Sequence, residues 1–315
     1  MPEAIRAADV TKVYTSSGEG VWNVDLSLPE GRVVGLIGPS GSGKTTLVRL
    51  LTGLLEPDSG RIEVLGKDPA RFEGATRSRI GYLPQRSALY PALSVRENLE
   101  FAAALHGMRG RKRREACDRV LAFVELEKAQ GQKVSEISGG MRRRVGLATA
   151  LVHSPELMFL DEPTAGLDPI LRRTIWEHLL ELRTRDRTLV VTTQIVGEAA
   201  YCDYIAVLSE GRVAEWGEPE ELRRRAFGGE LVDVLFAQRP AWSTIEEIAD
   251  SIGATETRNT GPRKVRFTVP DAGSAIPLAT AAAEKAGAEL EEVERIVPEF
   301  DDVFVRIVDN HRALV

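Results

Sequence analysis

The sequence has few cysteines and no long hydrophobic run. Only two of its 315 residues are cysteines, Cys117 and Cys202, and their spacing matches neither a metal site nor a disulfide framework. Two isolated cysteines favour a reducing compartment, and we predict that both side chains are buried as small hydrophobic groups.

Membrane-spanning and targeting segments are also missing. Residues 145–160 form the longest apolar stretch, but His153, Pro155 and Glu156 interrupt it. It therefore falls short of the roughly 18 apolar residues that a membrane helix needs. The first six residues, 1–6, lack the basic-then-apolar pattern of a signal peptide. We expect the chain to stay in the cytoplasm.

The net charge of −6 argues against general nucleic-acid binding, which normally needs a basic surface. The charge is uneven: residues 226–315 hold 16 acidic and 9 basic residues, net −7, which leaves +1 for residues 1–225. A chain of this length suggests two or three domains. We place the boundary at 225/226, between the run Glu221–Arg225 and Phe227-Gly228-Gly229.

The two parts differ in pattern. In residues 1–225, buried strands are predicted at 32–37, 157–160 and 189–192, between helical stretches. This indicates an α/β fold with a parallel-sheet core, and residues of about 86–150 form a helical subdomain. In residues 226–315 the predicted order is βαββαβ with a final helix opened by Pro298, which is typical of a small α+β, ferredoxin-like domain.

A phosphate-binding loop follows the first buried strand. Residues 38–45, GPSGSGKT, fit the pattern G-x-x-x-x-G-K-[ST] between a strand and a helix. Glycines let backbone N–H groups wrap an anion, and the helix N-terminus adds positive potential. Lys44 would reach the β- and γ-phosphates, and the Thr45 hydroxyl would bind Mg²⁺.

Two carboxylates end a second apolar strand. Residues 157–160 are followed directly by Asp161 and Glu162. Asp161, at the strand tip, would bind Mg²⁺ through water. Glu162 could polarise the attacking water as a general base.

With these motifs, residues 137–142, ISGGMR, resemble the signature of ATP-binding cassette (ABC) ATPases. The resemblance covers about residues 5–225. It implies that Tyr14 stacks on adenine, that Gln85 joins Mg²⁺ and the water, and that Asp168 lies in a loop crossing a dimer interface. It also implies that Ser138 and the helix it caps face the γ-phosphate held by a second cassette. The implied nucleotide-binding residues are Tyr14, Gly38, Pro39, Ser40, Gly41, Ser42, Gly43, Lys44, Thr45, Thr46, Ser138, Gly139, Gly140, Met141, Asp161 and Asp168.

One position departs from the family pattern. The strand 189–192 and Thr193 are followed by Gln194, where the family usually has a histidine. Glutamine donates a hydrogen bond but stays neutral, so we expect slower hydrolysis, by about tenfold. Gln194 is also compatible with one asymmetric half of a heterodimer. The predicted catalytic residues are Lys44, Gln85, Glu162 and Gln194.

The end of the chain indicates one branch of the family that it resembles. Residues 297–305, VPEFDDVFV, resemble the ending of export-type cassettes that move drugs, lipids or polysaccharides, and they also suit an amphipathic helix with Val303, Phe304 and Ile307 inward. Residues 88–94 are the predicted docking site for a membrane subunit. The basic segment 109–114 is interpreted as a solvated face, or alternatively as a contact to anionic lipids. The run Arg142-Arg143-Arg144 is interpreted as a solvated helix face.

The sequence therefore predicts the ATPase subunit of an ABC exporter, with ATP and Mg²⁺ as ligands. Its expected partners are a second cassette and an integral membrane permease, which would hold it at the cytoplasmic face of the membrane. The alternatives are a non-transport ABC ATPase and a regulatory nucleotide-binding module with low turnover.

Overall fold

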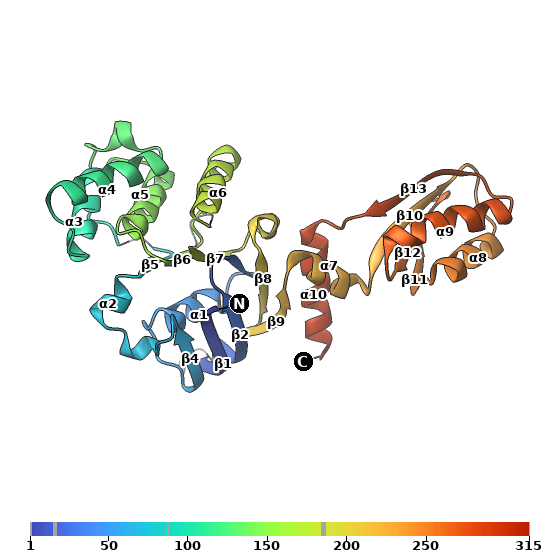
Figure 1. Cartoon of the computed structure of the whole chain (residues 1–315), viewed down its shortest axis with the longest axis horizontal. Helices are drawn as coiled ribbons and strands as arrows, with labels where there is room; N and C mark the ends of the chain where they lie inside the picture. The colour runs from blue at the N-terminus through green and yellow to red at the C-terminus, as the bar shows by residue number, and fades with distance from the viewer. Residues whose placement is uncertain (1, 15–17, 87, 184–186, 315) are drawn as a thin grey trace. The chain divides into compact units, whose positions relative to one another are not determined.

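The computed structural model describes residues 2–14, 18–86, 88–183 and 187–314 (Figure 1). Contacts within the chain define two compact units, Met1–Trp216 and Gly217–Val315. The division precedes the boundary placed at 225/226, because α7 (Pro219–Phe227) packs against α10 (Phe300–Leu314). The Arg306 guanidinium lies 4.6 Å from the Phe227 ring centroid. The sequence break near 225 is thus a helix end, capped by Gly228 with φ of 72°.

A six-stranded sheet forms the centre of the first unit, in the order β5-β6-β7-β3-β8-β9. The pairs β3–β7, β3–β8, β5–β6 and β6–β7 are parallel, as predicted. Every residue of β3, β6 and β7 is buried, which explains their continuous apolar runs. The strands are β3 (Val33–Ile37), β5 (Ile80–Leu83), β6 (Leu157–Asp161), β7 (Thr188–Thr193), β8 (Tyr204–Ser209) and β9 (Arg212–Gly217).

A second, antiparallel sheet in this unit was not predicted. It has the order β2-β1-β4 and consists of β1 (Glu3–Val13), β2 (Gly20–Pro29) and β4 (Ser59–Val64). Helix α1 (Lys44–Leu51) buries its apolar side chains in a core shared by both sheets. This packing fixes the start of α1, and therefore the phosphate loop, against the parallel sheet.

Helices α3 (Val95–Leu105), α4 (Gly110–Phe123) and α5 (Gly139–Leu151) form the helical part within 86–150 and pack on one another. Figure 1 shows them grouped beside α6 (Pro169–Arg183) and away from the antiparallel sheet. The remaining short elements are α2 (Gly74–Arg77) and the 3-10 turns Pro69–Arg71, Glu127–Ala129 and Val196–Tyr201. Cys117 and Cys202 are both buried, which confirms their predicted packing role.

The second unit has the predicted βαββαβ order. A four-stranded antiparallel sheet, β11-β12-β10-β13, is covered on one face by α8 and α9. Its elements are β10 (Glu230–Phe236), α8 (Trp242–Ile252), β11 (Glu256–Asn259), β12 (Lys264–Val269), α9 (Ala272–Lys285) and β13 (Leu290–Ile296). In α10, Val303 and Ile307 are buried as predicted, whereas Phe304 is only half-buried. The ferredoxin-like assignment stays a prediction.

Candidate nucleotide site

The phosphate loop lies where β3 meets α1. Gly43 caps α1 with a φ of 96°, and a side chain there would also strike Val21, at 2.7 Å. A Cβ at Gly38 would lie 2.3 Å from the Leu208 carbonyl oxygen. Glycine is therefore needed at both positions, for backbone conformation at the first and for close packing at both.

Lys44 is buried, and its ammonium binds the loop that it follows. Nζ donates to the carbonyl oxygens of Gly38 and Pro39, each at 2.8 Å, and to Ser42 Oγ at 3.5 Å. Burial lowers the pKa of Lys44 below its ordinary value, and the nearby Glu162 and Asp161 carboxylates offset only part of this shift. The side chain is thus held in the mouth of the loop, the place required for contact with phosphate.

Thr45 and Asp161 meet across the site. Thr45 Oγ1 donates to Asp161 Oδ2 at 3.0 Å, and the Thr192 hydroxyl also donates to Asp161. Parallel pairing of β6 with β7 places Thr192 beside Asp161. The Asp161 carboxylate is 1% exposed, so these hydroxyl groups satisfy an otherwise desolvated charge.

Glu162 leaves the end of β6 in an uncommon backbone conformation. Its φ is 53°, and its N–H donates to both the carbonyl oxygen and the hydroxyl of Thr192, each at 3.0 Å. Its carboxylate accepts a hydrogen bond from Gln194 Nε2. The structure therefore joins the predicted general base directly to the residue that departs from the family pattern.

One cavity, of about 160 Å³, collects most of the predicted residues. Its lining includes the loop from Ser40 to Thr46 together with Tyr14, Gln85, Glu162 and Gln194. Tyr14 Oη lies 3.4 Å from Thr46 Oγ1. The motifs, which are far apart in sequence, thus converge on one place.

The signature residues and Asp168 are not part of this cavity. Ser138 caps α5 by accepting from the Met141 N–H at 3.2 Å, as its sequence position predicts. Gly139 and Gly140 line a different cavity, of about 690 Å³, which also includes Ala165 and Gly166. Asp168 accepts from the N–H groups of Ile170 and Leu171 at the start of α6.

One interpretation of the arginine run was wrong. Arg142 is exposed and Arg144 is half-buried, but Arg143 is only 8% exposed and turns inward. Its guanidinium donates to the backbone carbonyl oxygens of Pro84, Gln85, Asp161 and Glu162. Three consecutive arginines gave no sign of this, because burial of the middle one depends on the strand ends that α5 covers.

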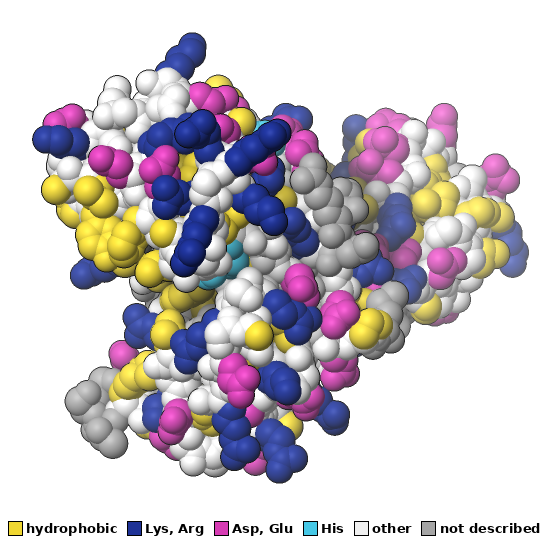
Figure 2. All heavy atoms as spheres, turned by 60° about the vertical axis from the view of Figure 1, so that its left-hand side comes forward, with side chains coloured by type: hydrophobic (Ala, Val, Ile, Leu, Met, Phe, Trp, Pro, Cys, Tyr) yellow, Lys and Arg dark blue, Asp and Glu magenta, His cyan; other side chains and the backbone are white. Residues whose placement is uncertain are grey.

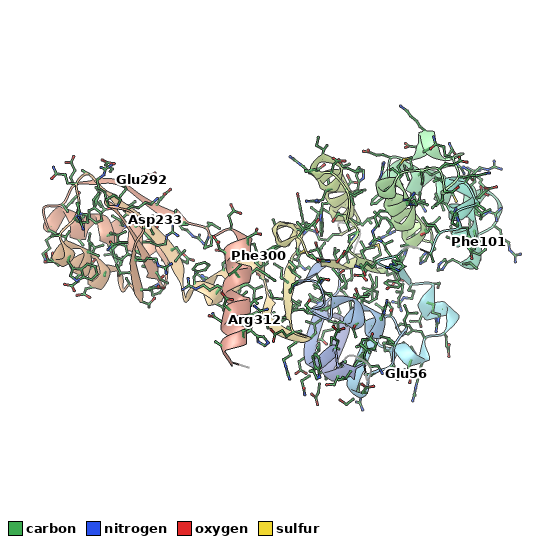
Figure 3. The ribbon with its side chains drawn as sticks, turned by 180° about the vertical axis from the view of Figure 1, so that it is seen from behind. Glu56, Phe101, Asp233, Glu292, Phe300 and Arg312 are labelled. Atoms are coloured by element: carbon green, nitrogen blue, oxygen red, sulfur yellow. The ribbon has the colours of Figure 1, made fainter. Side chains whose placement is uncertain are left out.

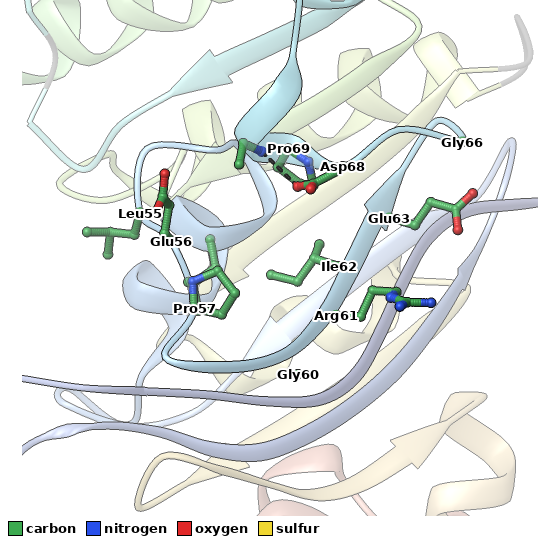
Figure 4. Close-up of a pocket in the computed structure, with 12 residues that line it drawn as sticks. Leu55, Glu56, Pro57, Gly60, Arg61, Ile62, Glu63, Gly66, Asp68 and Pro69 are labelled. Atoms are coloured by element: carbon green, nitrogen blue, oxygen red, sulfur yellow. Dashed lines mark hydrogen bonds between the residues drawn. The ribbon is translucent and has the colours of Figure 1, made fainter.

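Two other hollows lie in the first unit. The hollow in Figure 4, of about 520 Å³, is lined by residues around β4, including Leu55, Ile62 and Asp68, and holds none of the predicted site residues. The other, of about 420 Å³, lies between the helical part and β5 and includes Tyr90 and Phe101. Among the described residues, no group of three or more His, Cys, Asp and Glu side chains forms a metal cluster. Nor does any helix of that part combine the length and apolar character needed to cross a membrane.

A strand–loop–helix with Lys44 and Thr45, next to a strand ending in Asp161 and Glu162, defines a P-loop nucleotide-binding protein. A family model described as "ABC transporter" matches residues 21–165. The daunorubicin resistance ATP-binding protein DrrA3 of Streptomyces coeruleorubidus is 39% identical over 92% of each chain. The chain belongs to the ABC transporter family, as one of its ATP-binding, ATP-hydrolysing proteins.

Other relatives agree with this assignment. The Nod factor export ATP-binding protein I of Rhizobium etli is 40% identical over 73% of each chain. Among solved structures, the dimeric, post-hydrolysis ATP-binding cassette MJ0796 bound to ADP and Pi is 30% identical, with a TM-score of 0.64. The matched region spans 68% of this chain and 98% of the MJ0796 chain. A solved ATP-binding subunit of an ABC transporter gives a TM-score of 0.65 at 29% identity. The matched region spans 71% of this chain and 93% of that subunit. The predicted α/β fold and ABC family are confirmed.

Proposed function

We propose that this chain is the ATP-hydrolysing subunit of an ABC exporter, which energises export of a drug, lipid or polysaccharide through a separate membrane subunit. The observation that carries the hydrolytic part is the convergence of Lys44, Glu162 and Gln194 on one cavity. The export-type ending at 297–305 and the names of the drug-resistance and Nod-factor relatives support the transport part.

The residues present fit a magnesium ion. Thr45 Oγ1 and the Asp161 carboxylate lie 3.0 Å apart, and Gln85 lines the same cavity. These are hard oxygen donors, and Mg²⁺ usually takes one or two carboxylates with the remaining positions filled by water and substrate phosphates. Thr45, Asp161 and Gln85 would hold the ion, which would neutralise phosphate charge when bound.

Hydrolysis would depend on four side chains. Lys44 and the loop N–H groups would stabilise negative charge on the phosphates. The Glu162 carboxylate would orient the attacking water and take its proton, and Gln194 would hold that carboxylate in place. Gln85 would help place the water. Tyr14 would stack on the adenine ring.

A second cassette is part of the proposal. Ser138, Gly139 and Gly140 lie at the N-terminus of α5 but outside their own chain's nucleotide cavity. A helix N-terminus with free N–H groups binds anions well. These residues, with Met141 and Asp168, would therefore complete the site of a partner copy, or of a related cassette in a heterodimer.

The membrane subunit would dock in the hollow beside β5. Three large apolar side chains are exposed there: Tyr90 (49%), Phe101 (41%) and Leu105 (72%). The ring centroids of Tyr90 and Phe101 lie 4.8 Å apart. Figure 2 shows hydrophobic side chains gathered on this side of the helical part, and Figure 3 labels Phe101 there. The buried Asn98 accepts from the Tyr90 N–H at 2.8 Å and donates to the Tyr90 and Ser94 carbonyl oxygens. A loop anchored by Asn98, with its exposed Tyr90 ring against Phe101 of α3, suits an apolar segment of a permease, which would keep the chain at the cytoplasmic face of the membrane.

The hydrolytic part is tested by phosphate release from MgATP with the purified full chain and Glu162→Gln as the control. We expect steady turnover in the wild type and almost none in the variant. ATP binding with turnover no higher than that of Glu162→Gln would instead indicate a low-turnover regulatory module.

The transport part is tested by purifying the tagged chain from membranes of its own host and identifying any integral membrane protein that comes with it. We expect the two to co-purify and Phe101→Glu to abolish the complex without reducing basal hydrolysis. Absence of any membrane partner, with hydrolysis intact, would favour a non-transport ABC ATPase.

A further inference from the structure

Arg143 stands apart from the other two arginines in its run. Helix α5 places it in the second turn, where it is 8% exposed, whereas Arg142 is exposed. All the hydrogen bonds of its guanidinium go to backbone carbonyl oxygens. Such a group is costly to bury unless its donors are satisfied, so the arrangement requires the carbonyls to stay where they are.

The guanidinium spans two loops of the nucleotide site. Nε and Nη2 both donate to the Glu162 carbonyl oxygen, at 3.0 and 2.8 Å, and Nη2 also donates to that of Asp161. On the other side, Nη1 donates to the carbonyl oxygens of Pro84 and Gln85, at 2.8 and 2.9 Å. One planar side chain thus links the end of β6 to the loop after β5.

This link acts on the backbone that aims the general base. Glu162 has a φ of 53°, a conformation that non-glycine residues adopt only when their surroundings hold them there. Thr192 holds the Glu162 N–H, and Arg143 holds its carbonyl oxygen. With both ends of the residue fixed, the direction of its Cα–Cβ bond is set, and the Gln194 hydrogen bond holds the carboxylate at the end of the side chain.

We propose that Arg143 is a positioning residue for hydrolysis, which fixes the Glu162 and Gln85 backbones so that both side chains face the attacking water. The proposal rests on the proposed hydrolytic role of Glu162. Arg143 lines the cavity of the signature helix and not the cavity that contains the phosphate loop. Its loss should therefore affect the chemical step more than ATP binding.

Two substitutions distinguish the positive charge of Arg143 from the forked shape of its guanidinium. Arg143→Lys keeps a cation but replaces the planar fork by one nitrogen, which is too compact to bind both loops at once. Arg143→Met keeps a comparable length and removes every donor. Arg144 supplies a matched control, because it lies on the same helix and also donates to two carbonyl oxygens, those of Val124 and Glu125, which are outside the site.

The test compares kcat, KM and equilibrium binding of a fluorescent ATP analogue for Arg143→Lys, Arg143→Met, Arg144→Lys and Arg144→Met, with melting curves to verify folding. We expect kcat to fall about tenfold or more in both Arg143 variants, with nucleotide affinity within about threefold of wild type. The Arg144 variants should keep kcat within about twofold. If only Arg143→Met fails to fold, Arg143→Lys carries the test alone.

Two results would overturn the proposal. In the first, both Arg143 variants keep wild-type kcat while Glu162→Gln is inactive. In the second, melting temperature and affinity fall but kcat per folded molecule stays unchanged, which is the signature of a structural role alone. If Glu162→Gln itself retained full turnover, the proposed hydrolytic role of Glu162 would fail first, and the comparison distinguishes that result from a failure at Arg143.

Discussion

Replacement of Gln194 by alanine should slow ATP hydrolysis without weakening ATP binding. Gln194 Nε2 donates to the Glu162 carboxylate, and a hydrogen bond to a charged group contributes about 1.5–3 kcal/mol. Since Gln194 is exposed, we expect the lower end of this range. A loss of about 1.4 kcal/mol in the transition state is tenfold in rate. Gln194→Ala should therefore lower kcat about tenfold with little change in KM.

The assay is steady-state phosphate release at saturating MgATP, with Glu162→Gln as the baseline. Two further variants sharpen it. Gln194→His retains an N–H donor and can also carry positive charge, so it should raise kcat, by up to about tenfold over wild type. Gln194→Glu places two carboxylates together and should reduce kcat toward the baseline. Wild-type turnover in Gln194→Ala would refute the reasoning and remove Gln194 from the catalytic site.

Three other predictions concern Lys44, His153 and Asp233. Lys44→Met removes the ammonium from the loop mouth and should lower kcat at least about 100-fold, measured by phosphate release; a smaller loss than in Gln194→Ala would contradict its role. Burial, reinforced by the stacked His106, holds the pKa of His153 at about 4, below its ordinary 6.5, so the unfolded chain takes up the proton first. At about 1.4 kcal/mol per pKa unit, reduced because the ring is only half-buried, the free energy of unfolding should fall by about 2 kcal/mol as the pH drops from about 6.5 to about 4, and His153→Phe should flatten this slope in urea titrations. Asp233, 1% exposed, accepts from Arg266 at 2.6 and 2.8 Å, so Asp233→Asn should destabilise the second unit by about 2 kcal/mol. Urea unfolding of the full chain, followed by circular dichroism, measures this loss, and the exposed Asp250→Asn is the control.

Local patterns predicted the parts of the structure that depend on neighbouring residues. The phosphate loop, the strand ending at Asp161 and the strands predicted at 32–37 and 189–192 lie where the sequence placed them, to within one residue. Each is defined within a few residues, by glycine and lysine spacing or by a short apolar or alternating run bounded by turns. Such signals need no knowledge of distant contacts.

Features that depend on distant contacts were missed. The sheet β2-β1-β4 joins strands separated by the phosphate loop and α1, and register shifts in β1 near Asp9, with φ of 51°, blur its alternating pattern. The buried Arg143 could not be distinguished from its neighbours, because its partners come from the ends of β5 and β6. The sequence shows which residues are present, whereas these contacts exist only once α5 packs over the sheet.

Glu162 is held from three directions, and this arrangement bears on how two cassettes would cooperate. Thr192 of β7 holds its N–H, Arg143 of α5 holds its carbonyl oxygen, and Gln194 holds its carboxylate. Ser138, at the N-terminus of α5, would face the nucleotide of the partner cassette in the proposed dimer. Because Arg143 lies in the second turn of that same helix, movement of α5 toward the partner's phosphate would also move the anchor of the base in its own site. We therefore expect hydrolysis at each nucleotide to depend on closure around the other.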